Sequence, residues 1–424
     1  MATFLDLAPR GPVAARLPSD QWDVFLSYRS LSRPWVLRLY DILNELDYSV
    51  FMDQFVLSPD AGLRAQLEQG MRRSASAVLI WSARSEDSEW CQKEYDALGA
   101  LESRRDGFRS VVLRVDEVEL PLFAQAKLWI DFKDSPDGPT GTNLLRLVCG
   151  LHGLPLPPEG VRLAAVHDEA VRRSAARIDA ARAAGDADTL IALSQVAGEA
   201  WSTTPTLPCK AAEALIAVNR PDAALSMLEP LLRRFPRSIR PQQLKGLALA
   251  RQGDWRAAQA LLGELYALGE RDPETLGILA RTWRDRYLKA GGDPRHLRKA
   301  RNLYAEAFAQ APHDYYPGIN AAANSVLLGD LDVAEHHAAA VEKLVGTDVR
   351  PGDYWASATV AEVQLIRRQF KRAAELYQAA IDIAPEDRGS HESTGDQARR
   401  LLAQLNPSAE ERAMIEAMFP PRDT

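Results

Sequence analysis

The sequence predicts a protein in two parts, an α/β domain built on a five-stranded parallel sheet followed by an all-α solenoid of helical hairpins. Three observations lead to this fold class. Up to about residue 155, short apolar runs alternate with stretches of helical periodicity, which is typical of a parallel sheet covered by helices on both faces. Beyond about residue 160 the strand-like runs stop and alanine becomes abundant. There a spacing of small, bulky and proline residues recurs, which indicates helical repeats.

Length and charge set the broad class of protein. A chain of 424 residues has room for two to three domains. The net charge of −7 argues against a generic nucleic-acid binder, and no apolar run approaches the length that spans a bilayer. Three cysteines are few enough for a reducing compartment, and their spacing offers no metal-binding pair. We therefore expect a cytoplasmic protein with no metal, membrane or nucleic-acid partner, opening with a flexible leader over residues 1–20.

The α/β domain is expected over residues 21–155. Its strands are predicted from short apolar runs that end in polar loops. These runs cover residues 21–27, 48–52, 75–81, 108–115 and 127–131. Helices are predicted between them at 33–46, around Leu63, Leu67 and Met71, around Trp90 and Glu94, and at 142–152.

One pair of residues in this domain suits ligand binding. Trp90 and Glu94 are four positions apart, so they share one face of a helix. This helix follows a buried strand, which puts the pair near the carboxyl edge of the sheet, where open α/β folds bind ligands. An aromatic plate beside a carboxylate could grip a flat, cationic ring next to a sugar. The alternative is a half-buried tryptophan that packs on the sheet beside a solvated glutamate.

Four segments, in order along the chain, carry a resemblance to a known family. They are Asp23–Arg29 (DVFLSYR), Tyr48–Asp53 (YSVFMD), a loop with Pro59 and Gly62, and Trp90 with Glu94. Across about 130 residues they resemble a TIR (Toll/interleukin-1 receptor) domain, which has a flavodoxin-like sheet. The family includes adaptors that only assemble and enzymes that cleave NAD+. The enzymes carry a glutamate at the place of Glu94 and a tryptophan one turn before it.

The resemblance implies a catalytic Glu94, a substrate-binding Trp90, and NAD+ as the substrate rather than a cofactor. It also assigns Tyr28, Arg29 and Ser30 to the NAD+ pocket, although some animal members have a second arginine where Ser30 stands. A solvated surface arginine is an equal alternative for Arg29.

Asp53 and the loop after it have two interpretations each. Asp53 either contacts the ligand or caps the following loop, and capping is at least as well supported. The loop corresponds to the segment through which TIR domains reach a neighbouring TIR domain, and stacking commonly completes the enzymes' site. Leu57, Pro59 and Leu63 are then contact candidates for self-association. The alternative is an ordinary mobile loop.

Cleavage of the nicotinamide–ribose bond makes modest chemical demands. Nicotinamide leaves as a neutral molecule, so no strong general acid is needed. The transition state resembles an oxocarbenium ion, which a carboxylate near the ribose stabilises electrostatically. The product is either ADP-ribose or a cyclic ADP-ribose, and the sequence does not decide between them.

The second part of the chain reads as a helical repeat array. We expect a Pro-rich linker at residues 156–165 and the helical domain at 166–424. Small alanines let paired helices approach, a bulky residue fills the groove between them, and a proline ends the helix. The tetratricopeptide (TPR) repeat has this pattern and a length of 34 residues, which also separates Ala224 from Ala258. The pattern recurs as Ala224-Leu228-Leu231-Pro236, Ala300-Tyr304-Ala307-Pro312 and Ala373-Tyr377-Ala380-Pro385.

A stretch within this array is more particular. Asp272–Arg281, Arg284–Arg286 and Tyr316–Ala321 resemble the TPR-like TRAF-binding region of apoptosis-signal-regulating kinases, which implies a regulatory or oligomerising module. The charged residues at 281–286 form either a ligand pocket or an internal salt-bridge network, and the network is the preferred interpretation.

Two functions follow, from different classes. The first is a TIR NAD+ glycohydrolase whose repeats supply self-association or bind a protein trigger. Its composition and domain pairing are typical of bacterial proteins, and an antiviral (antiphage) or stress role would suit NAD+ depletion. The second is a scaffold that assembles through its TIR domain and repeats without catalysis. A nucleotide-sugar processing unit, such as a nucleoside transferase fold, is a weaker third, because no phosphate-cradling glycine loop follows a strand.

Overall fold

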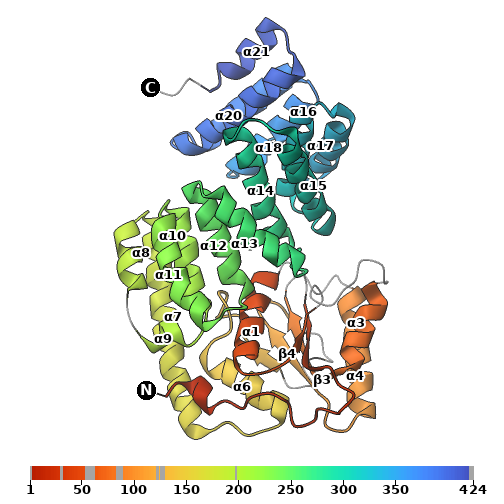
Figure 1. Ribbon diagram of the computed structural model, residues 1–424, viewed down its shortest axis with the longest axis vertical. Helices are drawn as coiled ribbons and strands as arrows, with labels where there is room; N and C mark the ends of the chain where they lie inside the picture. Colours follow the sequence, from red (N-terminus) through yellow and green to blue (C-terminus); the bar gives the residue numbers. More distant parts are fainter. Residues whose placement is uncertain are drawn as a thin grey trace. The chain divides into compact units, whose positions relative to one another are not determined.

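The computed structural model describes residues 2–28, 32–52, 63–82, 89–120, 124, 129–195 and 198–419, apart from the side chains at 63–66, 89–96 and 194. The chain divides into two compact units, Met1–Glu270 and Arg271–Thr424. The first unit holds the sheet together with the first helices of the array, and the second holds the remaining helices (Figure 1).

The sheet confirms the predicted fold class. Five parallel strands lie in the order β2-β1-β3-β4-β5. They are β1 (Trp22–Ser27), β2 (Val50–Phe51), β3 (Ser74–Trp81), β4 (Arg109–Arg114) and β5 (Trp129–Asp131). All eight residues of β3 are buried, as expected of a central strand covered on both sides.

Helices pack on both faces of this sheet. They are α1 (Arg33–Glu45), α3 (Leu63–Arg72), α4 (Glu89–Arg104) and α6 (Gly141–His152). Successive residues of β1 point to opposite faces, so Val24 and Leu26 join the core formed with α1 and α6, while Phe25 joins the core formed with α3 and α4. Strands and helices alternate along the chain, and the helices cover both faces of the sheet, so this is a doubly wound fold (Figure 1).

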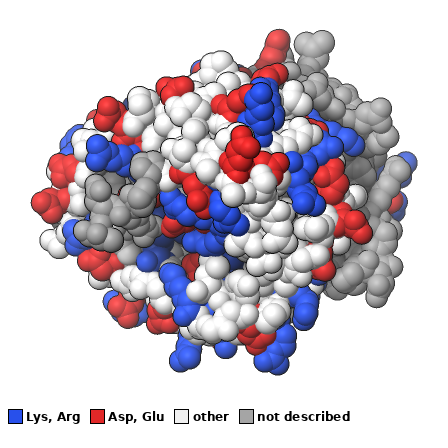
Figure 2. Space-filling view, turned by 90° about the horizontal axis from the view of Figure 1, so that it is seen from above, with Lys and Arg blue, Asp and Glu red and all other residues white. Residues whose placement is uncertain are grey.

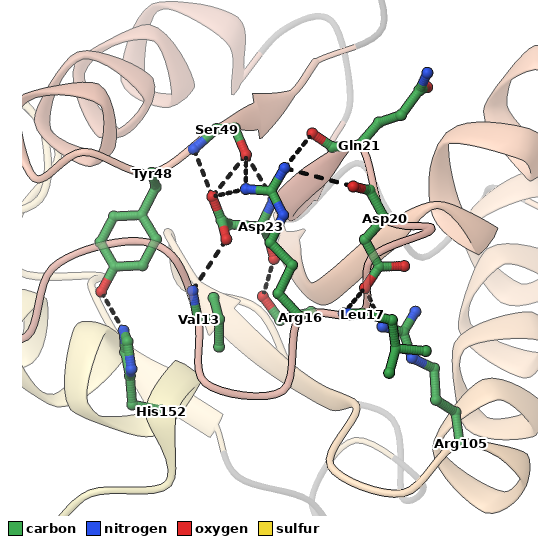
Figure 3. Close-up of polar contacts among 11 residues, drawn as sticks. Val13, Arg16, Leu17, Asp20, Gln21, Asp23, Tyr48, Ser49, Arg105 and His152 are labelled. Carbon is green, nitrogen blue, oxygen red and sulfur yellow. Dashed lines mark hydrogen bonds and ion pairs between the residues drawn. The ribbon is translucent and has the colours of Figure 1, made fainter.

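The segment before β1 differs from the expected flexible leader. Its 3-10 helix η1 (Phe4–Leu7) buries Phe4 and Leu5 in the core of the α/β domain. Farther along, the buried carboxylate of Asp23 accepts hydrogen bonds from the backbone N–H of Val13 at 3.0 Å and from Arg16 at 3.0 Å (Figure 3). These tertiary contacts hold the segment before β1 in place although it has little regular secondary structure. Local sequence patterns do not predict such contacts.

Charge removal at Asp23 tests this anchoring. In Asp23→Asn an amide NH₂ replaces a carboxylate oxygen, and Ser49 and Arg16 lose acceptors at a buried site. We expect the free energy of unfolding to fall by about 2–3 kcal/mol in urea titrations. The matched control is Asp47→Asn, because Asp47 forms an exposed pair with Arg10 and the expected change there is about 0–1 kcal/mol. Equal effects of the two substitutions would contradict the anchoring role.

The array begins earlier than the expected linker allows. Helix α7 starts at Pro158, so residues 158–165 of the predicted linker form its first turns. The physical reason is that proline fits the first turn of a helix, where its missing N–H has no partner to lose. The helices of the array that belong to the first unit are α7 (Pro158–Ala183), α8 (Ala187–Ser194), α9 (Glu199–Ser202), α10 (Thr206–Ala217), α11 (Pro221–Arg234), α12 (Ile239–Gln252) and α13 (Trp255–Ala267).

Buried charged side chains join α1 of the α/β domain to the first helices of the array. Arg38 of α1 donates to Glu213 of α10 at 3.0 Å, and Arg240 of α12 pairs with the same carboxylate at 3.0 Å. Asp41 of α1 accepts a hydrogen bond from the hydroxyl of Ser238, which precedes α12. The α/β domain and the start of the array therefore share one interior, which is why they form a single compact unit.

Asp41 makes the stability of this junction depend on pH. Burial raises the pKa of Asp41 from 3.8 to about 7, against the opposing effects of the Ser238 hydrogen bond and the Arg38 charge. Because the folded state holds this proton more tightly than the unfolded state, the stability contributed by the protonated acid is lost as pH rises from about 4 through about 7. Asp41→Asn should therefore lose less stability than the wild type between pH 5 and pH 8, by on the order of 2 kcal/mol in urea titrations. Parallel pH profiles of the two proteins would contradict this.

The second unit consists of helical hairpins and confirms the predicted repeat pattern. Tyr304 and Tyr377, which the pattern placed between paired helices, are fully buried, as are Ala300 and Ala373. Between α16 and α17 the chain turns at Gly329 with φ of +80°, a conformation that glycine adopts without steric cost. The helices are α14 (Pro273–Lys289), α15 (Pro294–Gln310), α16 (Tyr315–Leu328), α17 (Leu331–Val345), α18 (Tyr354–Ile366), α19 (Phe370–Ile383), α20 (Arg388–Leu405) and α21 (Ala409–Glu416).

Candidate functional site

The strand order locates the candidate site. From β1 the chain moves to β2 on one side and then returns to β3 on the other side of β1. The carboxyl ends of β1 and β3 therefore flank the topological switch point, where open α/β folds hold their ligands. The residues that follow these strands begin at Tyr28 and at Ser82, and α4 begins at Glu89.

The backbone of α4 carries the predicted catalytic position. Trp90 and Glu94 fall in the first two turns of this helix, which follows β3 at the switch point. Their side chains lie outside the described part of the structure. The backbone therefore shows that both residues lie in a helix that follows β3. The catalytic role of Glu94 remains a prediction.

Tyr28 is the predicted pocket residue whose side chain the structure describes. It directly follows β1, it is half-buried, and its hydroxyl accepts a hydrogen bond from Arg33 at 2.6 Å. Arg33, the first residue of α1, also forms a buried ion pair with Glu270, which follows α13. A carboxylate from the helical array therefore orients the arginine that holds Tyr28 at the edge of the sheet.

Sequence reasoning missed Arg33 and Glu270. An arginine before Pro34 carries no local signal for burial, so the sequence pattern places Arg33 only at the start of a helix. Its partner is 237 positions away along the chain, a separation that no periodicity relates to it. An acidic residue just after a repeat helix, such as Glu270, likewise gives no local sign that it is buried.

The other predicted site residues lie outside what the structure describes. Leu63 is the first residue of α3, but its side chain is among those not described. The remaining predictions concern Arg29, Ser30, Asp53, Leu57 and Pro59, all outside the described residues.

Near β5, at the other end of the same sheet edge, the acidic side chains form ion pairs within the domain. Asp131, at the end of β5, forms an ion pair with Arg114 of β4. Burial acts to raise the pKa of Asp131, but the hydrogen bonds from Arg114 and from the backbone N–H of Lys133 outweigh it and lower that pKa. Lys133 in turn pairs with Glu117 at 3.0 Å. This end of the edge is therefore suited to holding β4 and β5 together.

The surface carries charges of both signs. Figure 2 shows acidic and basic side chains interspersed over the face that it draws. Among the described helices, none is long and apolar enough to cross a membrane.

Comparison with known proteins identifies both parts of the chain. The TIR domain family matches residues 24–148, and the family named Tetratricopeptide Repeats-Sensor (TPR-S) matches residues 220–328. With its doubly wound parallel sheet, the first part is a TIR domain. The chain as a whole combines this TIR domain with a TPR-S domain, so the predicted family and architecture are confirmed. The finer resemblance to a TRAF-binding region remains a prediction.

Curated relatives match part of the TIR domain. An NAD(+) hydrolase, TcpA, from Theionarchaea archaeon is 33% identical over 85 residues, which cover 20% of this chain and 26% of the relative. A probable 2' cyclic ADP-D-ribose synthase, TcpB, from Brucella melitensis biotype 1 is 27% identical over 84 residues, or 20% of this chain and 34% of the relative. The match thus spans about a quarter to a third of the length of these relatives.

Solved structures resemble the helical part. A thermophilic TPR protein from Thermus thermophilus aligns with a TM-score of 0.37 and 22% identity, over 47% of this chain and 98% of that protein.

Proposed function

We propose that this protein is an NAD+ glycohydrolase that cleaves the nicotinamide–ribose bond with Glu94 as the catalytic carboxylate. The observation that carries the proposal is the position of Glu94 and Trp90, in the first two turns of the helix that follows β3 at the switch point of a TIR sheet. The names of two relatives, an NAD(+) hydrolase and a probable cyclic ADP-ribose synthase, support the same substrate.

The reaction balances with water and NAD+ alone. The bond between the anomeric carbon and the pyridinium nitrogen breaks, and its electron pair leaves with nicotinamide, which becomes neutral. The carboxylate of Glu94 stabilises the positive charge that develops on the ribose ring. Water then attacks the anomeric carbon and releases a proton to give ADP-ribose, or a nucleophile within the same molecule attacks to give a cyclic product. No cofactor is required in either course.

The residues around Glu94 have complementary roles in this proposal. Trp90, one turn before it on the same helix, stacks against the nicotinamide or another ring. Tyr28, Arg29, Ser30 and Asp53 contact the substrate from the loops after β1 and β2. The half-buried Tyr28 hydroxyl, fixed by Arg33, supports this assignment because a preorganised polar group costs little to reorganise during the reaction.

Self-association belongs to the same proposal. Leu57, Pro59 and Leu63 contact a second TIR domain, and stacked domains complete the site in the cytoplasm. The TPR-S domain contributes further self-contacts or binds a protein trigger, and depletion of NAD+ serves antiviral defence or a stress response.

Nicotinamide release from NAD+ by the purified full-length protein tests the proposal. Products are separated by chromatography, with and without forced clustering of the protein. Nicotinamide with equimolar ADP-ribose indicates a hydrolase, and nicotinamide with a cyclic product indicates a cyclase. Intact NAD+ under both conditions would favour the alternative, a scaffold that assembles through its TIR and TPR-S domains without catalysis.

A further inference from the structure

The second unit contains a largely buried arginine whose charge is not matched by an ion pair. Arg284 of α14 donates one hydrogen bond, from Nη1 to the Oδ1 atom of Asn320 on α16, at 2.6 Å. Its Nε is buried without a hydrogen-bond partner, and it forms no ion pair within the part of the chain that the structure describes. The sequence-based preference for a salt-bridge network therefore does not describe Arg284. A buried cation that lacks a carboxylate has donors left for another partner.

A second unsatisfied group lies on the same face of α16. Asn324 follows Asn320 by one helical turn and is fully buried, and neither atom of its amide has a hydrogen-bond partner among the described residues. Asn320, by contrast, accepts from Arg284 and donates to the backbone carbonyl of Tyr316 at 2.8 Å. Native interiors seldom leave both ends of an amide unpaired, so the Asn324 amide has one donor and one acceptor to offer to a further partner.

Glu362 is one of the acids whose charge acts on Arg284, and it forms no ion pair with that arginine in the described structure. Glu362 of α18 accepts a hydrogen bond from Gln397 of α20 at 3.1 Å. Burial raises the pKa of Glu362 to about 7, although Gln397 and the charge of Arg284 both act to lower it. Burial therefore weakens the negative charge that Glu362 sets against Arg284.

Tyr316, one of the groups that act electrostatically on Arg284, lies at the surface. Residue Tyr316 is 46% exposed, and its ring meets the buried ring of Tyr304 edge to face, with centroids 6.2 Å apart. A small molecule that rests on Tyr316 therefore has an apolar ring surface beside a buried guanidinium.

We propose that Arg284, Tyr316, Asn320, Asn324 and Glu362, here called the Arg284 cluster, form a binding site for a small organic anion. A carboxylate or phosphate of the ligand pairs with the guanidinium of Arg284, a group whose planar donors suit both. The amide of Asn324 supplies one donor and one acceptor to the rest of the ligand. Most of these residues lie on α14 and α16 within the region that matches the TPR-S family, whose name includes a sensor. The site does not depend on NAD+ cleavage by the TIR domain.

Thermal unfolding of the full chain tests the site with three probes at constant ionic strength: inorganic phosphate, AMP and succinate. Saturating ligand should raise the unfolding midpoint of the wild type by roughly 3 °C or more. Arg284→Met should lose that shift. A response to phosphate or AMP identifies a phosphate ligand, and a response to succinate alone identifies a carboxylate ligand. If none of the three raises the midpoint of the wild type more than that of Arg284→Met, the proposal is overturned.

Two further variants keep the test decisive if Arg284→Met folds poorly. Glu362→Gln removes a competing negative charge and should enlarge the anion-induced shift, whereas an unchanged or smaller shift would contradict the site. Asn324→Leu should raise the ligand-free midpoint, because it replaces an unpaired buried amide with an apolar group of similar size. A lower ligand-free midpoint would mean that bound water already satisfies the amide, which contradicts its assignment to a ligand. As a matched control, Arg372→Met removes an exposed arginine of α19 and should leave the shift unchanged.

Discussion

Glu94→Ala should reduce NAD+ turnover by about 100-fold or more, while the unfolding midpoint stays close to that of the wild type. The reason is that, in the proposed mechanism, the carboxylate acts on charge that exists only in the transition state, so its loss raises the barrier to cleavage. Turnover is measured as nicotinamide release by the full-length protein under the clustering condition that gives the highest wild-type rate.

Two companion variants separate charge from shape. Glu94→Gln keeps the size of the side chain but removes the negative charge, so it should be nearly as impaired as Glu94→Ala. Glu68→Ala removes an exposed acid of α3 that pairs with Arg72 on the surface, and it should retain full turnover. Wild-type rates in Glu94→Ala would sink the proposed catalytic role, even if the protein does cleave NAD+.

Glu270→Ala should lower the free energy of unfolding of the first unit by about 3–5 kcal/mol. Both partners of the Arg33–Glu270 pair are almost inaccessible to solvent, with exposed side-chain fractions of 4% and 0%. Removal of the acid leaves a buried guanidinium uncompensated, which costs far more than the loss of an exposed pair. Urea titration of the full chain, followed by hydrogen exchange of the amides near Tyr28, measures both the loss and the release of the tyrosine.

The double variant Arg33→Met with Glu270→Leu provides the control for charge burial. Apolar side chains of similar size have no charge to desolvate, so the double variant should recover most of the stability that Glu270→Ala loses. Because Arg33→Met removes the hydrogen bond from Arg33 to the Tyr28 hydroxyl, faster hydrogen exchange near Tyr28 should persist. If Glu270→Ala is as stable as the wild type, the pair does not join the TIR domain to the array in solution.

The elements that sequence patterns predicted well are those whose burial follows a period. Strand β3 is a continuous apolar run and is buried along its whole length. Ala300 and Tyr304 lie at the predicted repeat spacing and are buried between helices. The order of strands and helices, together with the Trp90–Glu94 spacing, was enough to recognise the TIR domain. In each case the information is local, because a few neighbouring residues determine which face of an element is apolar.

Local patterns were insufficient wherever a single polar side chain decides the structure. Asp23 reaches back to Val13 and holds a segment that was expected to be flexible. Asp41 and Ser238 are 197 positions apart, yet they meet in the interior that joins the TIR domain to the helical array. Such contacts depend on how whole elements dock, and one aspartate on a helix looks like any other before docking.

By itself, then, the sequence determined the parallel sheet, the helical repeats, their family memberships and the position of the proposed catalytic glutamate on its helix. Only the tertiary structure decided that the leader packs onto the domain, that Glu270 orients Arg33 beside Tyr28, and that the Arg284 Nε and the Asn324 amide lack partners among the described residues. The physical reason is range. Apolar periodicity acts between neighbours along the chain, whereas the energy of a buried charge or amide depends on which distant group completes its hydrogen bonds.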